Sequence, residues 1–199
     1  TPVQGPIASD RKMIAVLPMR NLGAAEDEFF AAGITDEILT RLATVKGLGV
    51  ISAGTESTDQ GVIRIGSVGQ ELGADYVLTG SVRWASSGDD SRRVRISPKL
   101  IRVDDETHLW AEVYDRSVDD IFEIQTEIAL TVVRELGAAL LEPEREAIAS
   151  RPTENAEAYQ AYMRGIWAAD SVDCDFIRSR VVYLHRATEI DPSFAEAWA

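Results

Sequence analysis

Apolar residues in the first half of the chain alternate between short continuous runs and helical repeats. Residues 13–18 and 48–53 are continuous apolar runs, which predict strands buried on both faces, as in a parallel sheet. A third strand is predicted at residues 75–84, where β-branched and aromatic side chains are frequent. Between the first two strands, spacings of three and four predict one face of a helix, formed by Phe30, Ile34, Ile38, Leu42 and Val45. The order β-α-β-α-β includes a shorter helix predicted from its own apolar positions, Ile65, Val68 and Leu72.

The pattern changes after the third strand, because turn residues now separate alternating strands. Residues 85–92 are rich in Ser, Gly and Asp and predict a hairpin tip. Pro98 interrupts the returning strand and indicates an edge position or a bulge, because proline has no N–H to donate. A second turn at residues 104–107 leads into a strand predicted at residues 109–114. We therefore expect a mixed sheet in which antiparallel strands extend a parallel core.

Local sequence marks the ends of the helices. Lys46 and Gly47 predict the end of the first helix, with the glycine in the left-handed conformation. Ser117 begins a capping-box pattern that opens a long helix, and helical character is expected to continue to about Ile148. The apolar face of this helix is predicted to comprise Ile121, Ile124, Ile128, Val132, Leu136 and Leu140.

Pro152 breaks the helical pattern and predicts a domain boundary, after which Thr153 or Asn155 can cap a further helix. The predicted order up to this point is β-α-β-α-β-β-β-α, an α/β fold in which helices flank a mixed sheet. We expect a linker at residues 1–12, the α/β domain at residues 13–150 and a helical unit at residues 151–199.

The net charge of −13 narrows the choice of partners. Binding to nucleic acid depends on Lys and Arg side chains that neutralise phosphates, and no basic stripe is visible, so we expect no nucleic-acid partner. The lone cysteine, Cys174, excludes an intramolecular disulfide and a multi-cysteine metal site. No apolar run approaches the ~18 residues of a spanning helix, and the N-terminus lacks a signal-peptide core. The linker-like start and the apolar periodic end suggest that both termini are boundaries within a longer protein.

Catalytic chemistry has no positive signal in the sequence. His108 and His185 are the only histidines, and no Gly-x-Ser-x-Gly elbow accompanies either of them. Clustered carboxylates fall at predicted turns or at a helix cap, and this position explains them without a metal ion. The glycines from Gly61 to Gly69 match neither a dinucleotide fingerprint nor a phosphate-binding loop. We therefore assign no catalytic, cofactor-binding or metal-binding residue and expect no cofactor.

Two groups of residues are candidate contacts for a ligand or partner. Arg20 and Asn21 follow the first strand at its carboxyl end, and Thr35 lies in the helix behind it. This edge is a common ligand crevice in open α/β sheets, although a plain connecting loop is the alternative. The second group comprises Tyr159, Tyr162 and Trp167. Packing between helices is the first interpretation of these aromatic residues, and lining of a peptide-binding groove is the second.

Three stretches of the chain resemble the TolB N-terminal type of domain. They are IAVLP with FFAAGITDEIL at residues 14–18 and 29–39, ELGADYVLTGSV at residues 71–82, and HLWAEVYDR with DIFEIQ at residues 108–116 and 120–125. The resemblance covers about residues 12–142, and it depends on the order and spacing of the three stretches rather than on any single one.

The C-terminal part resembles a tetratricopeptide (TPR) repeat. Pro192 occupies the closing-proline position, and Trp198 falls on the aromatic position that opens the next repeat. Two features depart from the motif, because residues 170–175 make a long connection and Arg180 stands where a small residue is usual. The expected content is one repeat and the start of a second.

The resemblance implies a sensory or regulatory segment beside a TPR array. Such domains occur in bacterial class III adenylate cyclases, CadC-type winged-helix regulators and receptor-like Ser/Thr kinases, where the catalytic or DNA-binding unit usually lies upstream, often followed by a membrane helix. The resemblance therefore favours a location in the periplasm over one in the cytoplasm. It also predicts a protein or peptide partner at the TPR and a small ligand at the α/β domain. The predicted function is a non-catalytic binding module, and the alternatives are a structural spacer or a metal-assisted hydrolase domain.

Overall fold

The computed structural model describes residues 11–53, 65–85, 93–167 and 174–198. Seven strands are described: β1 (Lys12–Val16), β2 (Arg20–Asn21), β3 (Leu48–Ser52), β4 (Tyr76–Ala85), β5 (Arg93–Arg102), β6 (His108–Ala111) and β7 (Tyr114–Ser117). Their order in the sheet is β3-β1-β4-β5-β6, with β2 paired to β4 and β7 paired to β5. β1 pairs in parallel with β3 and β4, whereas β4 pairs antiparallel with β5. The predicted mixed α/β sheet is thus confirmed.

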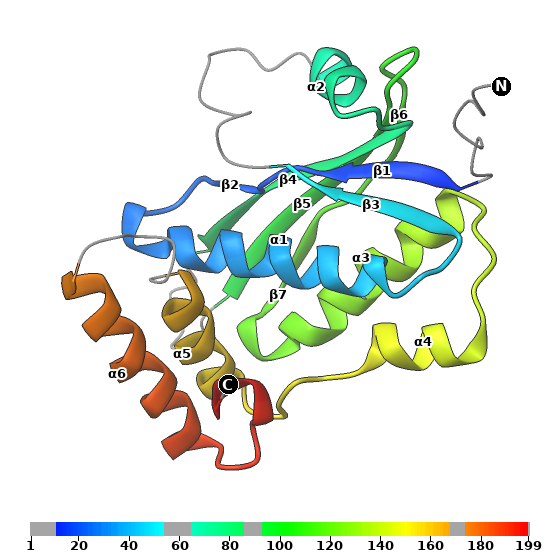
Figure 1. Cartoon of the computed structure of the whole chain (residues 1–199). Helices are drawn as coiled ribbons and strands as arrows, with labels where there is room; N and C mark the ends of the chain where they lie inside the picture. The colour runs from blue at the N-terminus through cyan, green and yellow to red at the C-terminus, as the bar shows by residue number, and fades with distance from the viewer. Residues whose placement is uncertain (1–10, 54–64, 86–92, 168–173, 199) are drawn as a thin grey trace, which may run out of the picture.

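Six α-helices are described: α1 (Glu28–Ala43), α2 (Ile65–Glu71), α3 (Ile121–Glu135), α4 (Glu142–Ala149), α5 (Ala156–Trp167) and α6 (Cys174–Ile190). Three short 3-10 helices lie at Ala25–Asp27, Val118–Asp120 and Ala195–Trp198. α1 and α3 cover one face of the sheet, and α2 lies on the other face (Figure 1). α5 and α6 form an adjacent helical pair, and α5 contacts α1.

The predicted apolar stripes form the main core. Every stripe residue of the first helix, from Phe30 to Val45, is fully buried, as are the stripe residues of α3 up to Val132. A smaller core on the opposite face lies under α2 and includes Ala15, Leu17 and Val77. The two cores explain why β1 reads as a continuous apolar run, because its alternating side chains enter both of them.

β5 passes through Pro98 without the predicted interruption. Gly80 of β4 faces Pro98 on one side. On the other side, β7 pairs with β5 up to Ile96 and β6 pairs with it from Lys99, so Pro98 lies where the neighbouring strand changes and its missing N–H disrupts no ladder there. A Cβ atom on Gly80 would lie 2.8 Å from the carbonyl oxygen of Ser97, so glycine permits the close approach of these strands.

Two predicted helix ends are wrong. α1 stops before Thr44, whose hydroxyl donates to the carbonyl of Arg41 at 2.7 Å, and Gly47 is not in the left-handed region. α3 does not continue to Ile148, because Gly137 adopts a φ of 59° and the chain turns before it enters the separate helix α4.

Two connections also differ from their predictions. Residues 20–27, for which a plain connecting loop is the alternative interpretation, contain β2 and a 3-10 helix, and β2 pairs with β4 at Ser81 and Val82. The strand predicted at residues 109–114 is divided into β6 and β7, which pair with opposite ends of β5. The hairpin tip beyond Ala85 and most of the glycine-containing loop before α2 lie outside the described residues.

The C-terminal helices pack directly on the α/β core. Met163 of α5 lies against Gly33 of α1, where an added Cβ atom would overlap the methionine sulfur. Buried residues of α5 and α6 belong to the same apolar core as those of α1 and α3. The domain boundary at Pro152 stays a prediction, and the segments on its two sides share one core.

Candidate functional site

A groove follows one side of α1, and we call it the α1–α5 groove. It has a volume of about 680 Å³ and lies between α5 and the carboxyl ends of β1 and β3. Its lining follows α1 from Ala32 to the end of the helix and includes Thr44, the residue just beyond it. This stretch corresponds to about 18 Å of helix axis.

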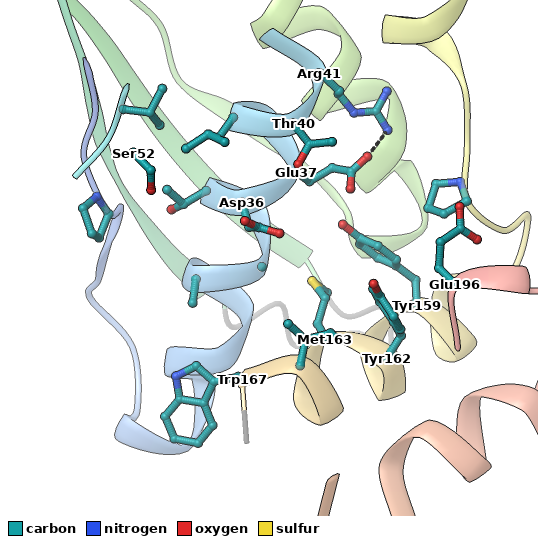
Figure 2. Close-up of a pocket in the computed structure, with 18 of the residues that line it drawn as sticks. Asp36, Glu37, Thr40, Arg41, Ser52, Tyr159, Tyr162, Met163, Trp167 and Glu196 are labelled. Carbon is teal, nitrogen blue, oxygen red and sulfur yellow. Dashed lines mark ion pairs between the residues drawn. The ribbon is translucent and has the colours of Figure 1, made fainter. Parts of the chain in front are cut away.

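α1 supplies three of the four charged side chains of the lining, because its apolar stripe is turned into the core. Asp36 and Thr40 are exposed on the opposite side, and Glu37 is half-buried between the two sides. Figure 2 shows the carboxylates of Asp36 and Glu37 directed toward the phenol groups that α5 contributes. The helical period therefore brings two acidic side chains to the side of α1 that faces α5.

The opposite wall is α5, which begins at a cap. The Asn155 side-chain oxygen accepts hydrogen bonds from the N–H groups of Glu157 at 2.9 Å and Ala158 at 3.1 Å. This confirms that Asn155 caps the helix. Ile166 and Trp167, at the far end of α5, remain 38% and 39% exposed, so this wall ends in an apolar surface.

Tyr159 anchors α5 to the α/β core. It is 2% exposed, its ring centroid lies 4.7 Å from that of Phe122, and its hydroxyl accepts a hydrogen bond from the Gln125 amide at 3.1 Å. Tyr162 is half-buried and packs against Phe194, with 4.9 Å between ring centroids. Tyr162 is therefore the more accessible phenol of the groove.

Arg41 is a buried cation in the groove wall. It is 2% exposed and forms an ion pair with Glu37 at 2.8 Å. Its guanidinium also donates to the Thr126 hydroxyl at 3.0 Å and to the backbone carbonyl of Ile148. Arg41 thus ties α1 to α3 and α4, and its charge is used inside the protein.

Negative charge gathers in the same part of the groove. Burial raises the pKa of the Glu37 carboxyl above its ordinary value, and Arg41 opposes that shift. Burial also raises the pKa of the Tyr162 phenol, and the charges of Glu196, Asp36 and Glu37 raise it further. The three carboxylates therefore act together on Tyr162.

The structure brings four of the six predicted contact residues to one site. Thr35, Tyr159, Tyr162 and Trp167 all line the α1–α5 groove. The Thr35 hydroxyl is already used, because it donates to the Ala31 carbonyl and accepts from the Met19 N–H.

The other two predicted contact residues lie elsewhere. Arg20 is exposed in β2 and does not line the groove. The side chain of Asn21 closes its own turn, because it donates to the Ala24 carbonyl and accepts from the Gly23 N–H at 2.8 Å. The strand end therefore does not gather both groups of candidates into one crevice.

Sequence reasoning missed the charged residues of the groove: Asp36, Glu37, Arg41 and Glu196. The spacing of Glu37 and Arg41 is a signal for an ion pair along a helix. The sequence offered no signal for the burial of Arg41 or for the approach of Glu196, because α3, α4 and the C-terminal 3-10 helix come from distant parts of the chain.

No histidine lines the groove. His108 is exposed, and His185 is paired with Glu189 on the surface of α6, so neither histidine lines the groove. The part of the chain that the structure describes contains no group of three or more His, Cys, Asp or Glu side chains placed to hold a metal ion. Within the same residues, no helix combines the length and apolarity needed to cross a membrane.

Comparisons with known proteins match most of this chain. Residues 9–131 match the family described as HilA/YgeH-like transcriptional regulator, second domain. A protein of Rhizobium meliloti (strain 1021) named putative adenylate cyclase 3 is 40% identical over 188 residues, which are 94% of this chain and 31% of that protein.

Two solved structures show more distant similarity. The PelC dodecamer of Paraburkholderia phytofirmans is 19% identical, with a TM-score of 0.47, over 69% of this chain and 96% of that chain. TolB from Acinetobacter baumannii is 18% identical, with a TM-score of 0.46, over 63% of this chain and 28% of that chain. The TPR character of the C-terminal helices stays a prediction.

Proposed function

The chain belongs to the family of HilA/YgeH-like transcriptional regulator second domains, and we propose from this premise that it is a non-catalytic regulatory module of a larger bacterial signalling protein. It spans 31% of the length of the relative named putative adenylate cyclase. The activity suggested by that name would therefore belong to parts of a full protein outside this chain. In this proposal the module binds a protein partner and transmits that event to the attached effector.

The chemistry of the α1–α5 groove carries the proposal. The buried hydroxyls of Thr35 and Tyr159 and the terminal nitrogens of Arg41 are bonded or ion-paired within the fold. The accessible groups include the carboxylates and the apolar side chains of Ile166 and Trp167. Exposed aromatic and apolar side chains beside polar groups are typical of protein-binding sites.

We further propose that α5 and α6 form the first repeat of a TPR array. Gly165 supports this arrangement, because a Cβ atom there would lie 2.8 Å from the Leu184 side chain and would keep the two helices apart. On the outer side of α6, Val181 and Val182 are 63% and 61% exposed. A following helix pair would cover this apolar surface, as repeats do in a solenoid.

Site-specific photocrosslinking tests the proposed function. The photoreactive residue p-benzoylphenylalanine would replace Ile166 in the groove of the full-length protein expressed in its host. The matched control places it at Val113, which is 61% exposed between β6 and β7. We expect a reproducible protein adduct at Ile166 that Val113 does not form.

The same experiment separates the module from a structural spacer. A spacer would give either no adduct at Ile166 or the same abundant proteins at both positions, and this result would contradict the proposal. A binding module predicts that effector output also changes when Ile166→Ser blocks the contact. An unchanged output despite loss of the adduct would limit the groove to tethering and would contradict a regulatory role.

A further inference from the structure

We propose that the α1–α5 groove binds an extended basic segment of a partner protein, with a Lys or Arg side chain between the carboxylates and an apolar side chain on Ile166 and Trp167. This inference rests on the proposed function and specifies the chemistry of its partner.

The charged side chains that line the groove determine the sign of the charge that a partner should carry. Four charged side chains line the groove, of which Asp36, Glu37 and Glu196 are acidic and Arg41 is basic. Arg41 is 2% exposed and is held by Glu37 and two groups of the core, so a ligand meets the carboxylates first. A cationic side chain would complement these charges and form charge-assisted hydrogen bonds with them.

The aromatic wall favours the same occupant. The phenol of Tyr162 and the carboxylates of Asp36 and Glu37 point into one space from opposite helices (Figure 2). A phenol oxygen accepts hydrogen bonds from ammonium or guanidinium groups, and its ring attracts a cation. Farther along α5, the exposed surfaces of Ile166 and Trp167 offer a contact for an apolar side chain of the same segment.

The length of the groove favours a polypeptide segment over a small molecule. The lining follows α1 from Ala32 to its C-cap residue Thr44, which is about 18 Å along the helix axis. An extended chain covers this distance with about five or six residues. A compact small molecule would reach either the carboxylates or the apolar end, whereas an extended segment reaches both.

Net charge disfavours the other macromolecular occupants. A second copy of the chain would bring another net charge of −13 against an acidic groove. Nucleic acids and anionic membranes would meet the same repulsion. A basic protein segment is therefore the occupant that the electrostatics favour.

Peptide binding to the complete chain tests this inference. Three fluorescein-labelled peptides of equal length would alternate Leu with Arg, Glu or Ser, and fluorescence anisotropy would give each Kd at two salt concentrations. We expect the Arg–Leu peptide to bind at least about tenfold more tightly than the Glu–Leu and Ser–Leu peptides. The double variant Asp36→Asn/Glu196→Gln should weaken Arg–Leu binding by about tenfold, and Ile166→Ser by about threefold.

A matched charge variant distinguishes peptide binding in the groove from a diffuse electrostatic attraction to an acidic protein. Glu71→Gln/Asp104→Asn removes the same charge from exposed residues that do not line the groove, and it should change the Kd by less than about twofold. Equal weakening by both double variants, or equal binding of all three peptides, would overturn the inference. Self-association in sedimentation velocity that strengthens in Asp36→Asn/Glu196→Gln would overturn it in favour of a second copy.

The two proposals fail separately. A specific adduct at Ile166 without a preference for the Arg–Leu peptide would contradict the basic partner and leave the regulatory module intact. Tight and groove-dependent peptide binding without any cellular adduct would support the basic chemistry of the site and count against the proposed function.

Discussion

The Tyr159→Phe substitution should lower the free energy of unfolding by about 1–2 kcal/mol, because it leaves a buried amide without an acceptor. The Gln125 side chain is fully buried, and its amide nitrogen donates to the Tyr159 hydroxyl at 3.1 Å. Phenylalanine preserves the ring and its contact with Phe122, so the apolar burial hardly changes. The lost stability therefore measures the hydrogen bond between α3 and α5.

A double-mutant cycle gives this prediction its control. Gln125→Leu should also destabilise the protein, because it strands the Tyr159 hydroxyl. The double variant Tyr159→Phe/Gln125→Leu should be more stable than the sum of the two losses by about 1 kcal/mol or more, since no polar group then lacks a partner. Tyr162→Phe is the comparison at a half-buried phenol, and it should cost less than about 0.5 kcal/mol.

Urea unfolding followed by circular dichroism would measure all four variants, with the slope of the transition checked for constancy. Additive losses in the cycle would refute the reasoning, because they would show that the two side chains do not interact. A separate unfolding transition for α5 and α6 would refute the shared core across Pro152, since one core predicts one transition.

Three further predictions concern the fold around the site. Arg41→Ala should cost about 3 kcal/mol in urea unfolding, because Glu37 loses its buried partner, whereas Arg116→Ala at an exposed ion pair should cost less than about 1 kcal/mol. Gly80→Ala should destabilise the sheet by about 1–3 kcal/mol, because its Cβ would lie 2.8 Å from a carbonyl oxygen; Gly47→Ala meets only ordinary contacts and should change stability by less than about 0.5 kcal/mol. Hydrogen bonds from Ser193 and Thr153 hold the pKa of the Asp191 carboxyl below its ordinary value of 3.8. The folded state therefore binds that proton less readily than the unfolded state, so this contribution is present above about pH 4 and is lost as the pH falls through the folded pKa. Unfolding midpoints measured from about pH 5 to about pH 3 should fall less steeply in Asp191→Asn, and an unchanged slope would contradict this assignment.

Local sequence patterns were sufficient to predict features that depend only on residues close together in the chain. The three-and-four spacing from Phe30 to Val45 placed the buried face of α1, and Asn155 marked the start of α5, because each depends on neighbours within a helical turn or two. Local patterns were insufficient at Pro98, which is tolerated inside β5 because two other strands divide their pairing there.

The candidate site shows the same division. From the sequence alone, the aromatic residues of α5 were recognised as candidate contacts, and the periodicity of α1 determined which side of that helix faces water. Only the tertiary structure decided that these two surfaces form one groove, that Arg41 is buried beside Glu37 and that Glu196 approaches from the end of the chain. The physical reason is the sequence separation of the interacting residues. Helical periodicity depends on residues a few positions apart, whereas the charge and shape of the groove depend on contacts between segments more than a hundred residues apart.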